Sequence, residues 1–191
     1  MKKINITLPD QTIKVYDVGA TGAEIAMSIG EGLFRASIAI KANGDLIDLN
    51  APILKDSVVE IITTKSNDAH HILMHSTAHL LAQSIKEMFP KSKIAIGPAL
   101  EDRFYYDIDL DETINENVLI QIETKMKEIS KRNLNIKRKV FNQSKALQFF
   151  ENIDETYKVE IISELDENEE ISAYEQGDFV DLCKGPHVPS T

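Results

Sequence analysis

Hydrophobic and polar residues alternate in short stretches near the start of the chain, a pattern typical of β-strands. The stretches 4–8 (INITL) and 12–18 (TIKVYDV) alternate on either side of a polar turn at residues 10–11. Together they predict a β-hairpin. A short helix is expected next, because Thr21 and Glu24 have the spacing of a capping box.

Further strands are expected within residues 36–50 and 57–64 (SVVEIITT). The Asn43-Gly44 pair favours a type I′ turn, which joins two adjacent antiparallel strands. Two strands, a helix and two or three more strands fit a β-grasp (ubiquitin-like) fold. The polar run 65–70 then indicates a boundary. We therefore predict one domain at residues 1–64.

The remaining chain, residues 65–191, mixes helical and strand patterns and predicts an α+β domain. A long helix is expected at 69–89, where leucines recur with helical spacing and Pro90 follows. The later expected elements are a β-hairpin at 93–110, a helix at 115–133, a strand at 136–142, a helix at 143–152, a strand or short helix at 157–165, and two strands with a Gly-Pro loop at 170–188. The sequence leaves open whether this domain is truncated at its carboxyl-terminal end.

The charge and cysteine content restrict the function classes. The net charge of −10 argues against a general nucleic-acid binder held by phosphate neutralisation. The basic stretch 124–145 fits either a solvated surface or a phosphate contact. Cys183 is the single cysteine, so an internal disulfide is excluded and a reducing compartment is expected. With no apolar run long enough to span a membrane, the sequence predicts a cytoplasmic protein without a membrane partner.

Three histidines and the single cysteine form two pairs with the same spacing. His75 and His79 stack on one helix face, although one such pair also fits a hydrogen-bonded core. Cys183 and His187 flank a Gly-Pro turn that brings a thiol and an imidazole together. This His₃Cys set could hold Zn²⁺, or it could orient water and substrate without a metal.

Four segments carry a family resemblance. They are HSTAHLLAQ (75–83), AIGPALEDRFYYDID (95–109), TYKVEI (156–161) and DLCKGPHVPST (181–191). In this order and spacing they resemble the editing domain of bacterial threonyl-tRNA synthetases. Residues 1–64 resemble the TGS domain that precedes it in the same enzymes. Arg103 departs from the glycine that the family usually has before FYYD.

The resemblance implies an amino-terminal fragment of a class II threonine-tRNA ligase. Its expected activity is post-transfer editing, the hydrolysis of serine wrongly esterified to the 3′ end of threonine tRNA. A synthetic site discriminates weakly against serine, because a missing methyl group changes binding by only ~1–3 kcal/mol. The aminoacylation domain, which would use ATP and zinc, is absent from this chain. The rest of the synthetase is an expected partner, with a homodimer expected for the full-length enzyme.

The resemblance also implies the roles of nine residues. The expected catalytic residues are His75, His79, Lys158, Cys183 and His187, and the expected substrate-binding residues are Gly97, Pro98, Tyr105 and Asp181. Lys158 suits an oxyanion-stabilising role, but a structural salt bridge is an alternative. A water nucleophile is favoured over Cys183, and no metal is expected to be required.

Two other functions remain open at this point. A zinc-dependent hydrolase of the alanyl editing type would use the same His₃Cys set as metal ligands. A non-catalytic module that binds RNA or a protein partner would use the histidines only as structural residues. Metal analysis and a deacylation assay separate these functions.

Overall fold

The computed structural model describes residues 2–100, 102–167 and 169–191. The chain divides into two compact units, one of residues 1–73 with 185–189 and the other of residues 74–184 with 190–191. The first division falls within helix α3 (Ala69–Met88). The proposed domains at 1–64 and 65–191 stay a prediction.

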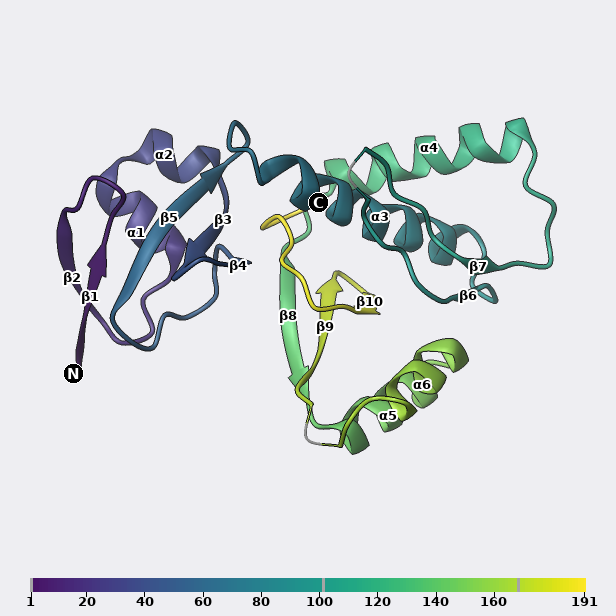
Figure 1. Ribbon diagram of the computed structural model, residues 1–191. Coiled ribbons are helices and arrows are strands. Elements are labelled where there is room, and N and C mark those ends of the chain that lie inside the picture. Colours follow the sequence, from purple (N-terminus) through teal and green to yellow (C-terminus); the bar gives the residue numbers. More distant parts are fainter. Residues whose placement is uncertain (1, 101, 168) are drawn as a thin grey trace. The chain divides into compact units, whose positions relative to one another are not determined.

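The first unit is built on a five-stranded sheet in the order β2-β1-β5-β3-β4 (Figure 1). Its strands are β1 (Lys3–Thr7), β2 (Ile13–Asp17), β3 (Ser37–Ala42), β4 (Asp45–Asp48) and β5 (Ser57–Thr63). Strand β1 runs parallel to β5, whereas the other neighbouring pairs are antiparallel. Between β2 and β3 lie helices α1 (Gly22–Ile29) and α2 (Glu31–Ala36). This is the predicted β-grasp arrangement.

Local signals in the sequence explain how these elements begin and turn. The side chain of Thr21 accepts a hydrogen bond from the Glu24 backbone N–H, and the Glu24 carboxylate accepts one from the Thr21 backbone N–H. The predicted capping box is therefore confirmed. Asn43 and Gly44 have positive φ angles of 53° and 96°, as a type I′ turn between β3 and β4 requires.

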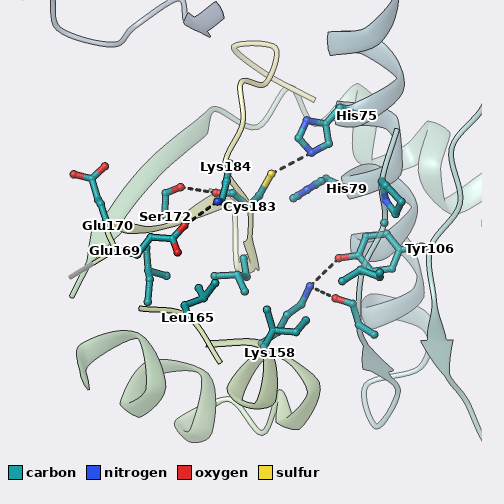
Figure 2. A pocket seen from close by; sticks show the side chains of 17 residues that line it. His75, His79, Tyr106, Lys158, Leu165, Glu169, Glu170, Ser172, Cys183 and Lys184 are labelled. Atoms are coloured by element: carbon teal, nitrogen blue, oxygen red, sulfur yellow. Dashed lines mark hydrogen bonds and ion pairs between the residues drawn. The ribbon is translucent and has the colours of Figure 1, made fainter. Parts of the chain in front are cut away.

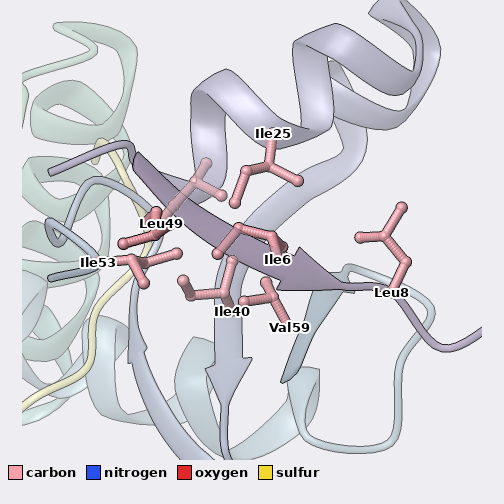
Figure 3. Close-up of a cluster of buried hydrophobic side chains, with 8 residues drawn as sticks. Ile6, Leu8, Ile25, Ile40, Leu49, Ile53 and Val59 are labelled. Carbon is pink, nitrogen blue, oxygen red and sulfur yellow. The ribbon is translucent and has the colours of Figure 1, made fainter. Parts of the chain in front are cut away.

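The core of the first unit lies between the sheet and α1. Ile6 from β1, Ile25 from α1 and Ile40 from β3 are fully buried and pack together with Val59 from β5 (Figure 3). The inward positions alternate with exposed ones along β1, which is the period-2 pattern of a strand with one solvated face. Burial of this one face fixes the strand register.

The second unit combines helices with two small sheets. Its helices, besides α3, are α4 (Glu116–Lys131), α5 (Gln143–Asn152) and α6 (Thr156–Ser163). A three-stranded antiparallel sheet, in the order β10-β9-β8, contains β8 (Ile136–Phe141), β9 (Ile171–Gln176) and β10 (Phe179–Leu182). A two-stranded sheet pairs β6 (Lys93–Ile94) with β7 (Ile108–Asp109).

Two elements of the second unit were predicted with their details left open. Residues 157–165, expected as a strand or a short helix, are helical as far as Ser163 in α6. The hairpin expected at 93–110 begins with a regular ladder of two residues on each strand. Backbone hydrogen bonds of Ala95 and Ile96 with Asp107, and an isolated bridge between Ala99 and Phe104, continue the pairing. Gly97 and Pro98 interrupt the regular ladder, because proline cannot donate a ladder hydrogen bond.

The core beside α5 and α6 supports one wall of the site described below. Phe150 of α5 and Ile162 of α6 are fully buried against Ile171 and Ala173 of β9. Truncating a buried aromatic side chain typically costs about 3–5 kcal/mol. Helix α6 is therefore held firmly against the sheet that ends in β10.

Candidate active site

The second unit contains a cavity of about 490 Å³ (Figure 2). Its walls come from α3, the loop between β6 and β7, α6, β9 and the end of β10. Ile161, Leu165 and Leu182 make part of the wall apolar. The polar and small residues of the wall include His75, His79, Gly97, Pro98, Tyr106, Lys158, Ser172 and Cys183.

Helix α3 supplies the two histidines, and Cys183 approaches them from the end of β10. The His75 and His79 rings lie edge to face with their centroids 5.2 Å apart, as residues four apart on a helix should. The Cys183 Sγ lies 3.1 Å from Nε2 of His75 (Figure 2). One ligand atom from each of these three side chains lies within 4.8 Å of the others.

His79 is the more buried of the two histidines, at 4 % exposure. Burial, together with the electrostatic effect of His75 and Lys158, holds the pKa of His79 well below its usual range. Its Nδ1 lies 3.5 Å from Oδ2 of Asp181. The imidazole is therefore neutral near pH 7 and has one ring nitrogen free of a proton.

Lys158 is a buried cation at the base of the cavity, at 2 % exposure. Its Nζ lies 2.6 Å from Oδ1 of Asp181, donates to the Ala95 carbonyl at 2.5 Å, and donates to the Tyr106 hydroxyl oxygen at 3.1 Å. An ammonium group has three N–H donors. Two of them are used by the Ala95 carbonyl and the Tyr106 hydroxyl, and Lys158 both forms a structural ion pair with Asp181 and lines the cavity.

Asp181 lies behind the cavity wall. It is fully buried on β10, where it pairs with Lys158 and accepts a hydrogen bond from the Tyr106 hydroxyl. Asp181 therefore does not line the cavity itself. It contacts two polar residues that do, Lys158 and Tyr106.

The tyrosine that lines the cavity is Tyr106, whereas Tyr105 is the one that the resemblance implied. Tyr105 is 45 % exposed and does not line the cavity. Tyr106 lines it and bonds to Asp181. Neighbouring residues of an extended segment point to opposite sides, so a choice between the two depends on which side faces the core. Burial and the nearby Asp181 raise the pKa of Tyr106 well above its usual range.

Gly97 and Pro98, the expected substrate-binding residues of the loop between β6 and β7, both line the cavity. A methyl group on Gly97 would lie 2.1 Å from Cδ2 of Tyr106, far inside van der Waals contact. Only glycine leaves room for the ring at this point. The loop therefore contributes to placing Tyr106 as well as to the cavity wall.

His187, the fourth member of the predicted His₃Cys set, belongs to the segment 185–189 that is grouped with the first unit. It is buried, and its backbone N–H donates to Oδ1 of Asp48 at 2.9 Å. The second unit, by contrast, contains the other predicted residues His75, His79, Lys158 and Cys183 and the Gly97-Pro98 loop.

Two family models match the chain. A TGS domain model matches residues 4–63. A model described as the threonyl and alanyl tRNA synthetase second additional domain matches residues 171–191.

Whole-chain comparisons point to one group of enzymes. The chain is 48% identical over its full length to the threonine–tRNA ligase of Citrifermentans bemidjiense, of which it covers 30%. It is 48% identical over 97% of its length to that of Nitrosomonas eutropha, covering 29% of that enzyme. For that of Orientia tsutsugamushi, the identity is 46% over 98% of the chain and 29% of the enzyme.

The chain belongs to the threonyl-tRNA synthetase family. It spans about three-tenths of the length of these relatives, which agrees with the expectation that it corresponds to part of a longer synthetase. Among its described residues, no helix is both long enough and apolar enough to cross a membrane.

The chemistry of the donor set in this synthetase region is compatible with zinc. His75, His79 and Cys183 are typical zinc ligands, with bonds of about 2.0–2.3 Å that place tetrahedral donors roughly 3.5 Å apart. The 3.1 Å separation of Cys183 Sγ from His75 Nε2 equally suits a direct hydrogen bond. The side chains can thus bind zinc after small rearrangements, or contact each other without it.

Most cations of the basic stretch 124–145 have acidic partners. Lys127 pairs with Glu123, and Arg132 makes a two-pronged contact with Glu87 at 2.8 and 2.9 Å. Single ion pairs join Lys125 to Glu128, Arg138 to Glu170, and Lys139 to Glu175. This pairing favours the interpretation of the stretch as a solvated surface.

Three groups that support the site are not among the residues predicted from the sequence. The Ala95 carbonyl accepts a hydrogen bond from Lys158. The Ser172 hydroxyl donates to the Cys183 carbonyl at 2.6 Å and holds the cysteine backbone against β9. Glu155 lies one turn before Lys158 and is buried. Backbone acceptors have no sequence signal, but a glutamate at this spacing from a selected lysine is visible in the sequence.

Proposed function

We propose that this chain hydrolyses serine wrongly esterified to threonine tRNA. The observation that carries this proposal is the cavity in which a neutral imidazole, His79, and a buried ammonium, Lys158, both line the wall. An aminoacyl ester needs a proton acceptor for the attacking water and positive charge near the developing oxyanion. The family membership and the match to the second additional domain support the same assignment.

The proposed reaction begins with attack of a water molecule on the ester carbonyl carbon. A histidine of the α3 pair accepts a proton from that water, and a negative charge develops on the carbonyl oxygen. The bond between the carbonyl carbon and the ribose oxygen then breaks, and the ribose oxygen takes a proton. Serine leaves as the free amino acid, and the tRNA regains its terminal hydroxyl.

Lys158 is proposed to act through its charge. Two of its donors already bond to Ala95 and Tyr106, and its ion pair with Asp181 fixes the ammonium at the edge of the cavity. A buried charge acts over a longer distance than a hydrogen bond, because the low-dielectric interior screens it weakly. Asp181 is proposed to orient this ammonium and the Tyr106 hydroxyl.

Cys183 is proposed to form a wall of the cavity beside His75 and not to attack the ester. His187 is proposed to complete the cluster, because only three residues separate it from Cys183 and the chain keeps the two within reach. The remaining partners in this proposal are the 3′ end of threonine tRNA and the rest of the synthetase.

A deacylation assay with threonine tRNA carrying serine or threonine tests the proposal. The rate should fall roughly tenfold to a hundredfold from the serine to the threonine ester, because the extra methyl group must be forced against a packed wall. Equal hydrolysis of the two esters would contradict the second-sieve role. No hydrolysis of either, at high protein concentration with a short acylated acceptor-end helix, would favour a non-catalytic binding module.

A second candidate is a zinc-dependent hydrolase of the alanyl type. The description of the matched domain covers both threonyl and alanyl enzymes, and the donor set fits zinc. In that case His75, His79 and Cys183 would hold the ion, which would supply a Lewis acid and lower the pKa of a bound water. Faster hydrolysis of an alanine ester than of a serine ester, lost on chelation, would favour this candidate.

A further inference from the structure

Glu155 is a buried carboxylate that does not line the cavity. Its Oε1 lies 2.5 Å from Nζ of Lys86 on α3, whose side chain is 22 % exposed. Its Oε2 accepts a hydrogen bond at 3.3 Å from the backbone N–H of Ile94 on β6. One side chain therefore connects two separate elements of the second unit.

The backbone of Glu155 also begins the helix that carries Lys158. Its carbonyl accepts hydrogen bonds at 3.1 Å from the backbone N–H groups of Lys158 and Val159. Because a helix is stiff over a single turn, the position of Glu155 sets the position of the Lys158 Cα. The carboxylate and the carbonyl of one residue thus act on three elements together: α3, β6 and α6.

The same three elements hold the polar groups of the site. Helix α3 carries His75 and His79, while Ala95, the residue after Ile94, provides the carbonyl that accepts from the Lys158 ammonium. A shift of α6 relative to β6 would lengthen that 2.5 Å hydrogen bond. It would also move the ammonium away from Asp181.

We propose that Glu155, with Lys86 as its counter-ion, is a positioning residue that holds the Lys158 ammonium in register with Ala95, Tyr106 and Asp181. This inference rests on the proposed function, in which Lys158 stabilises the developing charge. Glu155 touches neither the cavity nor the substrate. Its effect is transmitted through the first turn of α6 and through Ile94.

The adjacent residue provides a matched control. Asp154 pairs with Lys93 of β6, so it also joins β6 to the segment that leads into α6, but its side chain is 80 % exposed. Exposed ion pairs contribute little to stability. Asp154→Asn keeps the size of the side chain, and asparagine tolerates the positive φ of 60° at this position. This variant should change neither the rate of deacylation nor its KM by more than about twofold.

The kinetic test uses Glu155→Gln, which keeps an acceptor for Ile94 but removes the charge that holds Lys86. We expect kcat for the seryl ester to fall roughly 10- to 100-fold with KM nearly unchanged, because a small misplacement of a catalytic group costs this much. Lys86→Met should reduce kcat similarly, whereas Lys86→Arg, which keeps the ion pair, should restore most of it. Rates are compared at temperatures where thermal denaturation shows each variant to be folded.

A second readout does not depend on activity. In ¹³C-labelled protein, the ε-methylene signal of Lys158 should shift in Glu155→Gln and stay in place in Asp154→Asn. If the unmodified chain hydrolyses neither ester, the proposed function fails, and this signal alone decides the positioning role. An unshifted signal overturns the inference. The inference is also overturned if Glu155→Gln has the same kcat as the unmodified chain. It is overturned as well if kcat falls as much in Asp154→Asn as in Glu155→Gln.

Discussion

The side-chain nitrogen of Lys158 lies 2.6 Å from Oδ1 of Asp181, and both side chains are withdrawn from solvent. A cation with no solvent shell must be stabilised by its protein partners, so the pair determines where positive charge is available in the cavity. The structural role and the proposed catalytic role of Lys158 are consequently coupled. Experiments on this residue have to measure both.

Replacement of Lys158 should affect activity and stability together. Lys158→Ala is expected to lower deacylation of the seryl ester about 10²-fold or more, the effect of removing one electrostatic group. It should also lower the free energy of unfolding by about 3–5 kcal/mol, because Asp181 is left buried without a cation. Urea denaturation and the deacylation rate check these outcomes.

The double variant Lys158→Met with Asp181→Asn separates the two effects. It should recover much of the lost stability, because no unpaired charge stays buried, but it should not recover activity. Full activity in either variant would exclude the proposed electrostatic role.

The two adjacent tyrosines should behave differently. Tyr106→Phe removes the hydroxyl that donates to Asp181 and accepts from Lys158. It should lower the free energy of unfolding by about 1–3 kcal/mol, the cost of leaving a buried polar group unsatisfied, and lower kcat roughly tenfold. Tyr105→Phe, at the exposed position, is the control and should leave both quantities within error of the parent chain. Equal effects of the two substitutions would contradict the placement of Tyr106 at the site.

Substitution of Cys183 separates a water mechanism from a covalent one. Cys183→Ala should weaken deacylation by less than about 10²-fold if the thiol only forms the wall beside His75. A covalent route through a thioester would lose essentially all activity. Trapping an acylated enzyme by rapid acid quench and mass spectrometry provides an independent check, and its detection would exclude the water mechanism.

The metal content of the purified chain should be well below one zinc per chain, and chelation should leave the seryl ester rate unchanged. The reason is that the proposed reaction uses a histidine as proton acceptor and the charge of Lys158, and needs no metal ion. Elemental analysis and the assay with and without chelator measure this. Stoichiometric zinc with activity that disappears on chelation would favour the zinc-dependent alternative.

Alkaline pH should destabilise the chain through Tyr106. Burial and Asp181 raise the pKa of this tyrosine in the folded state, so the folded state keeps its proton after the unfolded state begins to lose it near pH 10. The contribution of Tyr106 is therefore complete below about pH 10 and declines above it, by up to about 1.4 kcal/mol per pH unit. Urea unfolding between pH 9 and pH 11 should show a steeper decline for the parent chain than for Tyr106→Phe. Parallel curves would contradict this assignment.

Much of the fold follows from sequence patterns between residues that are only a few positions apart. The Thr21 capping box and the Asn43-Gly44 turn depend on residues within three positions of each other, so the sequence alone predicts them. The stacking of His75 with His79 likewise follows from the period of one helix. By contrast, the hydrophobic pattern of residues 157–165 does not distinguish a strand from a helix, because a stretch of this short length fits both.

The site itself depends on contacts between residues far apart in the chain. Whether Tyr105 or Tyr106 faces Asp181 is decided by which side of the segment the core covers, and the residue types at the two positions are identical. Only the tertiary packing of α6 buries Lys158 and brings it into contact with Ala95, Tyr106 and Asp181. The sequence by itself determined which chemical groups are available and the local elements that carry them. The tertiary structure decided which groups meet, because burial and electrostatic pairing act between elements and leave no periodic trace along the chain.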